Sequence, residues 1–200
     1  MNSIDKLSEM FAKFPGIGPR QAKRFVYFLL SKNDNYSGDL VRAIENLKKE
    51  IMQCESCQRF YAKNGHESKV CSICSDETRE HSMLMILSRD VDLEMVEKSG
   101  SYHGQYLVLG GVIPILEKEP EKRIRMKELD ARLRNDKELK EVVLAMNANL
   151  DGENTAEFIK ARFADSGLTF SILGRGLSTG AELEYADPET LKNAFLHRTK

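Results

Sequence analysis

Four cysteines in two Cys-x2-Cys pairs, Cys54 with Cys57 and Cys71 with Cys74, restrict what this 200-residue chain can fold into more than any other feature. Each short knuckle turns two sulfurs toward one point, and 13 residues separate the two pairs. Tetrahedral zinc is typically held by four such thiolates, and an ion bound in this way has no open position for water or substrate. The spacing therefore predicts one structural Zn²⁺ held by all four cysteines.

The alternatives to a four-cysteine zinc site are chance and a redox dithiol. Redox Cys-x2-Cys pairs usually occur singly, in a thioredoxin-like βαβ setting. His66 lies between the pairs and could replace one thiolate. With four cysteines present, we expect it to be a solvated loop residue. A zinc finger of residues 53–80 is too short to bury much core, so metal binding is expected to supply much of its folding free energy.

The overall charge gives no sign of a polyanionic partner. The chain has 30 Lys and Arg against 31 Asp and Glu, a formal net charge of −1, so a nucleic acid would have to bind a local patch. No apolar run approaches the roughly 18 residues that span a bilayer, and residues 1–6 offer no secretory apolar stretch. We therefore expect a cytoplasmic protein without a membrane partner. Thiols stay reduced in that compartment, which favours a metal site over disulfides.

Residues 1–52 are predicted to be helical. Two helices flank a turn at 14–19, which holds two glycines and two prolines. A further helix, with Asp39 near its start, is indicated by apolar residues at helical spacing. These residues are Leu40, Ile44, Leu47 and Ile51.

The turn at 14–19 lies in a strongly basic segment. Between Lys13 and Lys32 there are five basic residues and no acidic one, a local charge of +5. Glycines allow backbone N–H groups to approach a ligand closely, and the start of a helix favours a phosphate. Arg20 and Arg24 are four residues apart and share one helix face, which makes them the strongest candidates for phosphate contacts.

The segment from Phe14 to Arg20 resembles the helix-hairpin-helix motif, which holds the DNA backbone without reading sequence. The predicted DNA-binding residues are Lys13, Gly16, Gly18, Arg20, Lys23 and Arg24. The alternative is a plain helix-to-helix turn whose apolar residues simply pack, namely Phe14, Ile17, Phe25 and Phe28.

Beyond the cysteines, short apolar runs alternate with helical stretches, which predicts βαβ units and a mainly parallel, Rossmann-like sheet covered by helices. The strand-like runs are 83–87, 106–109, 142–146 and 170–173, and the helical stretches lie at 88–98, 126–134 and 153–164. Glu117 to Arg123 is a charged and exposed connection within this main domain.

The end of the third strand-like run, where parallel sheets keep their active sites, resembles the Toprim domain of topoisomerases and primases. That family holds magnesium with a glutamate and an Asp-x-Asp pair, and the corresponding residues here are Ser88, Asn147 and Asn149. Magnesium normally needs protein carboxylates, so a metal-dependent Toprim nuclease or primase is the disfavoured alternative. Weak ion binding stays open because acidic residues remain nearby: Asp90, Asp92, Asp151 and Glu153.

The segment from Thr179 to Asp187 contains Glu182, Glu184 and Asp187 and precedes a short apolar helix at 191–196. Acidic residues could form a nucleotide-metal site, but the chain has no phosphate-binding Gly-x4-Gly-Lys loop. A polar turn that leads into a packing helix, or a subunit contact, is at least as well supported.

The order of these parts resembles the bacterial recombination mediator family RecR over nearly the whole chain. The resemblance divides the chain into a helix-hairpin-helix DNA-binding region (1–52), a four-cysteine zinc finger (53–80), a Toprim domain (82–178) and a C-terminal acidic motif and helix (179–200). It implies a non-enzymatic protein that forms a ring-shaped tetramer, or a dimer, around DNA. It also implies RecO and RecF partners that help it load recombinase onto gapped or single-stranded DNA.

Three departures from the family pattern qualify this resemblance. The cysteine spacer is longer, with an insertion around Lys63 to Glu67. Ser88 replaces the Toprim glutamate, which puts partner docking or ion binding by that domain in doubt. The glycine- and proline-rich loop expected after Pro114 is replaced by Glu117 to Arg123. A zinc adaptor that binds only proteins is the remaining hypothesis, and the +5 segment argues against it.

Overall fold

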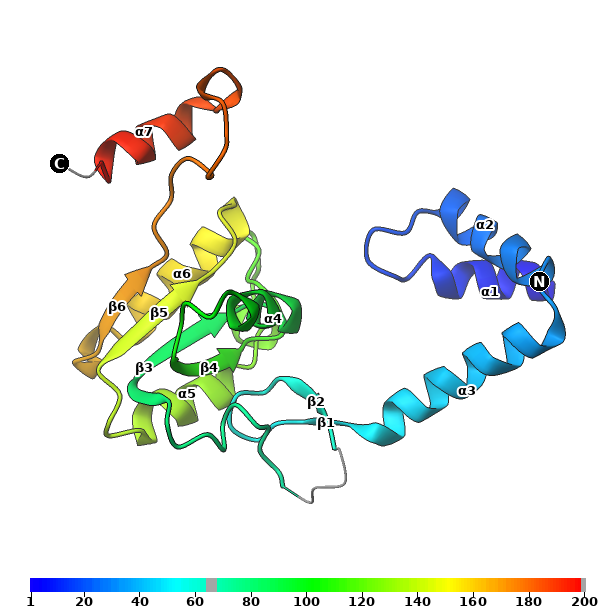
Figure 1. Cartoon of the computed structure of the whole chain (residues 1–200), viewed down its shortest axis with the longest axis horizontal. Coiled ribbons are helices and arrows are strands. Elements are labelled where there is room, and N and C mark those ends of the chain that lie inside the picture. Colours follow the sequence, from blue (N-terminus) through cyan, green and yellow to red (C-terminus); the bar gives the residue numbers. More distant parts are fainter. Residues whose placement is uncertain (64–67, 199–200) are drawn as a thin grey trace. The chain divides into compact units, whose positions relative to one another are not determined.

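The computed structural model describes residues 1–63 and 68–198 and divides into two compact units (Figure 1). The first is Met1–Met52 with Ala62–Asn64, and the second is Gln53–Tyr61 with Gly65–Lys200. The cysteine knuckles thus share a unit with the sheet that follows them. The four-part division expected from the sequence stays a prediction.

The first unit consists of three helices, α1 (Ser3–Phe11), α2 (Pro19–Leu30) and α3 (Asp34–Glu50). Helices do flank the glycine turn, as expected. The third helix begins earlier than Asp39, because the Asn33 side chain accepts a hydrogen bond from the Tyr36 N–H at 3.0 Å and caps the helix at that point. It also ends before Ile51, which begins strand β1.

The core of the first unit is small. Among the residues of this unit that the structure describes, only Ala22 and Val26 are buried, and the ring of Phe11 meets those of Phe14 and Phe25 edge-on at 5.8 Å between centroids. Phe14 nevertheless remains 57% exposed and Phe28 48% exposed. The purely structural interpretation of the turn therefore accounts for only part of its apolar side chains.

The second unit is built on a four-stranded sheet in the order β4-β3-β5-β6. The strands are β3 (Glu80–Leu87), β4 (Gly104–Val108), β5 (Glu141–Ala145) and β6 (Thr169–Ile172). All three pairings are parallel, and Leu87 is aligned with both Val108 and Ala145, so the strands end at a common edge. The predicted parallel sheet is confirmed.

Helices cover both faces of this sheet, as Figure 1 shows. Along β3, Leu84 and Ile86 join one core, and Met85 and Leu87 join the other, because alternate residues of a strand point to opposite faces. The first core includes buried residues of α5 (Met126–Asn135) and α6 (Leu150–Arg162); the second includes Leu93 of α4 (Asp90–Ser99) and three of the cysteines.

Short elements complete the chain. They are the paired strands β1 (Ile51–Gln53) and β2 (Phe60–Ala62), the 3-10 turns η1 (Pro120–Lys122), η2 (Ala164–Ser166) and η3 (Leu183–Tyr185), and helix α7 (Pro188–Leu196). The charged connection before α5 is mostly exposed and contains an ion pair between Glu117 and Arg123. No helix in the described ranges has the length and apolar character needed to cross a membrane.

Candidate metal centre and nucleic-acid interface

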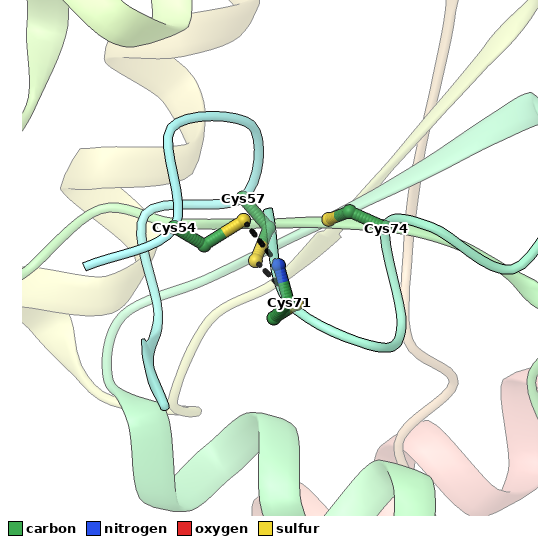
Figure 2. A group of neighbouring side chains, drawn as sticks. All are labelled: Cys54, Cys57, Cys71 and Cys74. Carbon is green, nitrogen blue, oxygen red and sulfur yellow. Dashed lines mark hydrogen bonds between the residues drawn. The ribbon is translucent and has the colours of Figure 1, made fainter. Parts of the chain in front are cut away.

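The four cysteines form a single cluster, with all sulfurs within 4.8 Å of one another. Cys54, Cys57 and Cys71 are buried and Cys74 is half-buried. Figure 2 shows the sulfur of Cys74 turned toward the other three. The structure thus brings together the four residues that the spacing predicts.

The cluster fits a tetrahedral zinc ion. Four sulfurs at about 2.3 Å from one ion lie about 3.8 Å from each other, and the sulfurs of Cys57 and Cys71 are 3.6 Å apart. The Cys71 N–H donates to the Cys54 sulfur at 3.3 Å, the kind of bond that orients a thiolate ligand. Among the described residues this is the only group of three or more potential metal-binding side chains, and it contains no histidine.

Close contact among the thiols shifts their pKa values in opposite directions. The pKa of Cys54 is lowered, mainly by its hydrogen bond with Cys57 and then by those with the other two thiols. The pKa of Cys57 is raised, mainly by its bond with Cys54, then by those with the other thiols and by burial. At Cys71 the contact with Cys54 raises the pKa, but bonds with Cys57 and Cys74 outweigh it and lower the pKa to about 6. Four thiolates in one buried place need a cation, which is what a divalent metal supplies.

The first knuckle is fastened to the edge of the sheet. The Val108 N–H of β4 donates to the Cys57 carbonyl at 2.8 Å, so the knuckle pairs with an edge that would otherwise be open. Arg125 donates to the carbonyls of Gln58 and Val108 at 2.7 and 2.9 Å, and its guanidinium lies 5.8 Å from the centre of the Phe60 ring. No local pattern in the sequence singles out Arg125 for this role.

The glycine hairpin of the first unit is a tight turn followed directly by a helix. The Ile17 N–H donates to the Phe14 carbonyl at 3.1 Å, with Pro15 and Gly16 between them and Gly16 at φ +77°. Proline followed by a residue of positive φ is the pattern of a type II turn, which is why glycine is needed at 16. Gly18 is the N-cap of α2 and Pro19 is its first residue. Because glycine has no side chain, the first N–H groups of α2 receive no side-chain cap.

Exposed basic side chains precede this hairpin and continue along α2 and just beyond its end. All five of them are exposed: Lys13, Arg20, Lys23, Arg24 and Lys32. Within the described ranges, no carboxylate forms an ion pair with any of the five. Arg24 donates only to the neighbouring Gln21 side chain, at 3.3 Å. Positive charge is therefore presented to solvent beside the turn, and the DNA contacts of these residues stay a prediction.

At the common edge of the sheet, the residues that the resemblance assigns to Toprim metal positions have local structural roles. Ser88 is buried and its hydroxyl contacts the Met146 sulfur at 3.4 Å. The Asn149 side chain accepts from the Gly152 N–H at 2.9 Å and caps α6, and the Asn149 N–H donates to the Asn147 carbonyl at 2.9 Å. The capping role of Asn149 was not predicted.

The other acidic candidates are dispersed among separate partners. Asp90 accepts from the Phe60 N–H at 2.7 Å, Asp92 pairs with Arg89, and Glu153 pairs with Arg175. Asp187 caps α7, and its hydrogen bond from Thr190 lowers its pKa. His66 lies outside the described residues, and so does most of the insertion expected around Lys63 to Glu67.

Comparison with known families agrees with this order of parts. Residues 4–48 match the family described as RecR, helix-hairpin-helix, residues 82–174 match the Toprim domain, and residues 176–199 match RecR, C-terminal. The Toprim match covers the four-stranded sheet with its helices and nothing of the cysteine cluster.

Curated relatives extend the similarity to the full length. A recombination protein RecR of Staphylococcus saprophyticus is 37% identical over 199 residues, covering 98% of this chain and 96% of its own length. Those of Bifidobacterium adolescentis and Streptococcus mutans are each 35% identical and cover 98% of this chain and 95% and 96% of their own lengths. With the hairpin, the cysteine cluster and the parallel sheet in the same order, this chain belongs to the RecR family of recombination proteins.

Proposed function

We propose that this protein is a non-enzymatic, sequence-independent DNA clamp that helps load recombinase onto gapped or single-stranded DNA, together with RecO and RecF type partners. Membership of the RecR family implies a role in recombinational DNA repair. The observation that carries the finer proposal is the hairpin of the first unit, where a type II turn offers N–H donors and the exposed basic residues beside it and along α2 form no ion pair with a carboxylate within the described ranges. Such groups hold phosphates and carry little base information.

The remaining parts support a scaffold rather than a catalyst. Zn²⁺ in the four-cysteine cluster would be structural, since four thiolates leave no position for substrate. At the carboxyl edge of the sheet, a serine and two amides take the place of the Toprim carboxylates, and Asn149 serves to cap α6. These neutral groups do not provide the charge that magnesium chemistry needs.

Arg20→Ala combined with Arg24→Ala is expected to weaken DNA binding and to flatten its salt dependence. The logarithm of affinity falls with the logarithm of salt concentration by about 0.7 to 0.9 per neutralised phosphate, so two lost contacts should reduce the slope by about 1.4 to 1.8. Fluorescence anisotropy of the full chain with a labelled oligonucleotide at several salt concentrations measures this slope.

The matched control removes the same charge elsewhere. Lys118 and Lys127 are exposed residues of the second unit, and Lys118→Ala with Lys127→Ala should leave the slope unchanged. A slope that is the same in the arginine variant and in the unaltered protein would show that the hairpin does not hold the phosphates.

A clamp also predicts self-association into a tetramer or a dimer. One chain presents a single hairpin, and weak backbone contacts become effective when several are tethered together. Sedimentation velocity with and without gapped DNA is expected to show an assembly of two or four chains in at least one condition. A strictly monomeric species in both conditions would contradict the clamp.

A further inference from the structure

The basic residues of α2 share their face of the helix with an aromatic side chain that no motif accounts for. At 100° per residue, Arg20, Arg24 and Tyr27 fall within about 60° of one another. The buried stripe, Ala22 and Val26 with the half-buried Phe25 and Leu29, lies on the opposite side of the same helix. Tyr27 is 54% exposed.

The Tyr27 ring is free to accept a planar partner. In the described part of the chain, no aromatic ring or cation lies against it. The adjacent Phe28 differs, because Lys32 Nζ lies 4.7 Å from its centroid and the Tyr36 ring meets it edge-on at 5.9 Å. Two neighbouring rings on one helix are thus exposed to similar extents, but only that of Tyr27 lacks such partners.

An exposed ring that shares a helix face with two arginines, about one turn beyond the nearer one, matches the way single strands are bound. Proteins that bind single-stranded nucleic acid combine positive charge along the backbone with aromatic rings on which bases stack. Tyr27 lies about 4.5 Å beyond Arg24 along the helix axis. In the interior of a duplex both faces of each base are covered by its neighbours, so along the strand it is an unpaired base that offers a face to the ring.

We propose that this face of α2, formed by Arg20, Arg24 and Tyr27, binds single-stranded DNA in preference to duplex, with the Tyr27 ring stacking on an unpaired base. The inference rests on the proposed DNA-binding function and adds the class of DNA to it. The arginines hold phosphates in either kind of DNA, and the tyrosine makes the difference between the two.

Tyr27→Leu tests the stacking contact. The probes are an oligo(dT) of 30 nucleotides, an oligomer of the same length and charge made of abasic sites, and a duplex. The unaltered chain is expected to bind oligo(dT) most tightly. The leucine variant should lose about fivefold to a hundredfold on oligo(dT) and nothing on the abasic strand. Tyr27→Phe should keep the preference, and the control Phe28→Leu should leave it unchanged.

A second measurement does not depend on affinity. The chain has no tryptophan, so Tyr27→Trp introduces a single tryptophan reporter at the position, which can be excited apart from the tyrosines. Stacking should quench its emission on addition of oligo(dT), and the abasic strand should leave the emission nearly unchanged.

The outcomes separate this inference from the function on which it rests. Two results would overturn the stacking and leave the DNA clamp intact. One is equal binding of all three probes that still depends on Arg20 and Arg24. The other is an equal loss of oligo(dT) and abasic binding in Tyr27→Leu. No binding of any probe at low salt would overturn both, and would leave a protein partner as the occupant of this face.

Discussion

Removal of the metal from the four-cysteine cluster is expected to unfold both knuckles and to destabilise the sheet beside them. Binding of zinc to such sites contributes on the order of 10 kcal/mol to folding. Here Cys54, Cys57 and Cys71 share a core with Met85 and Tyr106 of the sheet. Loss of the knuckles would expose that face to water, so the effect should extend well beyond residues 53–80.

The hydrogen bond from Val108 to the Cys57 carbonyl indicates which strand should be destabilised first when the metal is removed. Strand β4 is the edge of the sheet, and the first knuckle pairs with it. Without the knuckle, the Val108 N–H and the two carbonyls bound by Arg125 lose their arrangement. Hydrogen exchange should therefore accelerate in β4 on chelation, ahead of β5 in the middle of the sheet.

Three measurements check this expectation on the full chain. Elemental analysis should find about one zinc per chain, a chelator should lower the melting temperature, and Cys57→Ser should reproduce both the loss of metal and the faster exchange in β4. Ser72→Ala, an exposed change between the cysteines of the second knuckle, serves as the control and should retain zinc. Full stability in a zinc-free protein would show that the cluster is not a structural metal site.

The features of this protein that depend on a few neighbouring residues could be predicted from the sequence. The cysteine spacing fixes a four-sulfur cluster because each knuckle is local, and the apolar runs indicate parallel strands because those strands are buried on both faces. The hairpin is predictable for the same reason, since Pro15 and Gly16 impose the turn by their own backbone preferences.

The ends of α3 show where local patterns mislead. The spacing of Leu40, Ile44 and Leu47 continues to Ile51 and favours a longer helix, yet Ile51 lies in a strand. At the other end, the cap made by Asn33 starts the helix at Asp34, nearly two turns before the apolar series begins at Leu40. The cap determines where the helix begins, and strand pairing determines where it ends. Neither can be recognised from the spacing of apolar residues.

Contacts between distant residues could not be predicted. Arg125 reaches the carbonyl of Gln58, 67 residues away, and no pattern near either residue points to the other. Asn149 is different, because an asparagine just before a helix is a capping signal. The same asparagine also stands where the Toprim resemblance expects a magnesium ligand, so one residue type fits two interpretations, and the structure shows the capping role.

Gly152→Ala is expected to destabilise the second unit, against the usual preference for alanine in helices. Gly152 is buried in the first turn of α6, and an added Cβ would collide with the carbonyl oxygen of Asn147 and lie 3.1 Å from its carbonyl carbon. The obstacle is backbone, so it cannot swing aside as a side chain would. Helix propensity alone predicts a gain of about 1 kcal/mol, whereas crowding of this kind costs about 1–3 kcal/mol.

Relief of the collision would require the loop at 147–149 to move. That loop is held by the hydrogen bond from the Asn149 N–H to the Asn147 carbonyl, and the Asn149 side chain caps α6 through the Gly152 N–H. Loss of such a cap costs about a further 1 kcal/mol. The two costs together outweigh the propensity, so the melting temperature should fall and the amides at the start of α6 should exchange faster.

Gly38→Ala provides the matched control, because Gly38 lies in the helix α3 with room beside it. Its added Cβ would meet only the flexible Arg42 side chain, at 3.5 Å, which is ordinary contact. This variant should stabilise α3 by about 0.5–1 kcal/mol and slow its amide exchange. Opposite signs for the two substitutions would establish that Gly152 is required for space against the loop at the carboxyl edge of the sheet. Stabilisation by both would show that this loop yields freely, and the packing described for Asn147 and Asn149 would then be wrong.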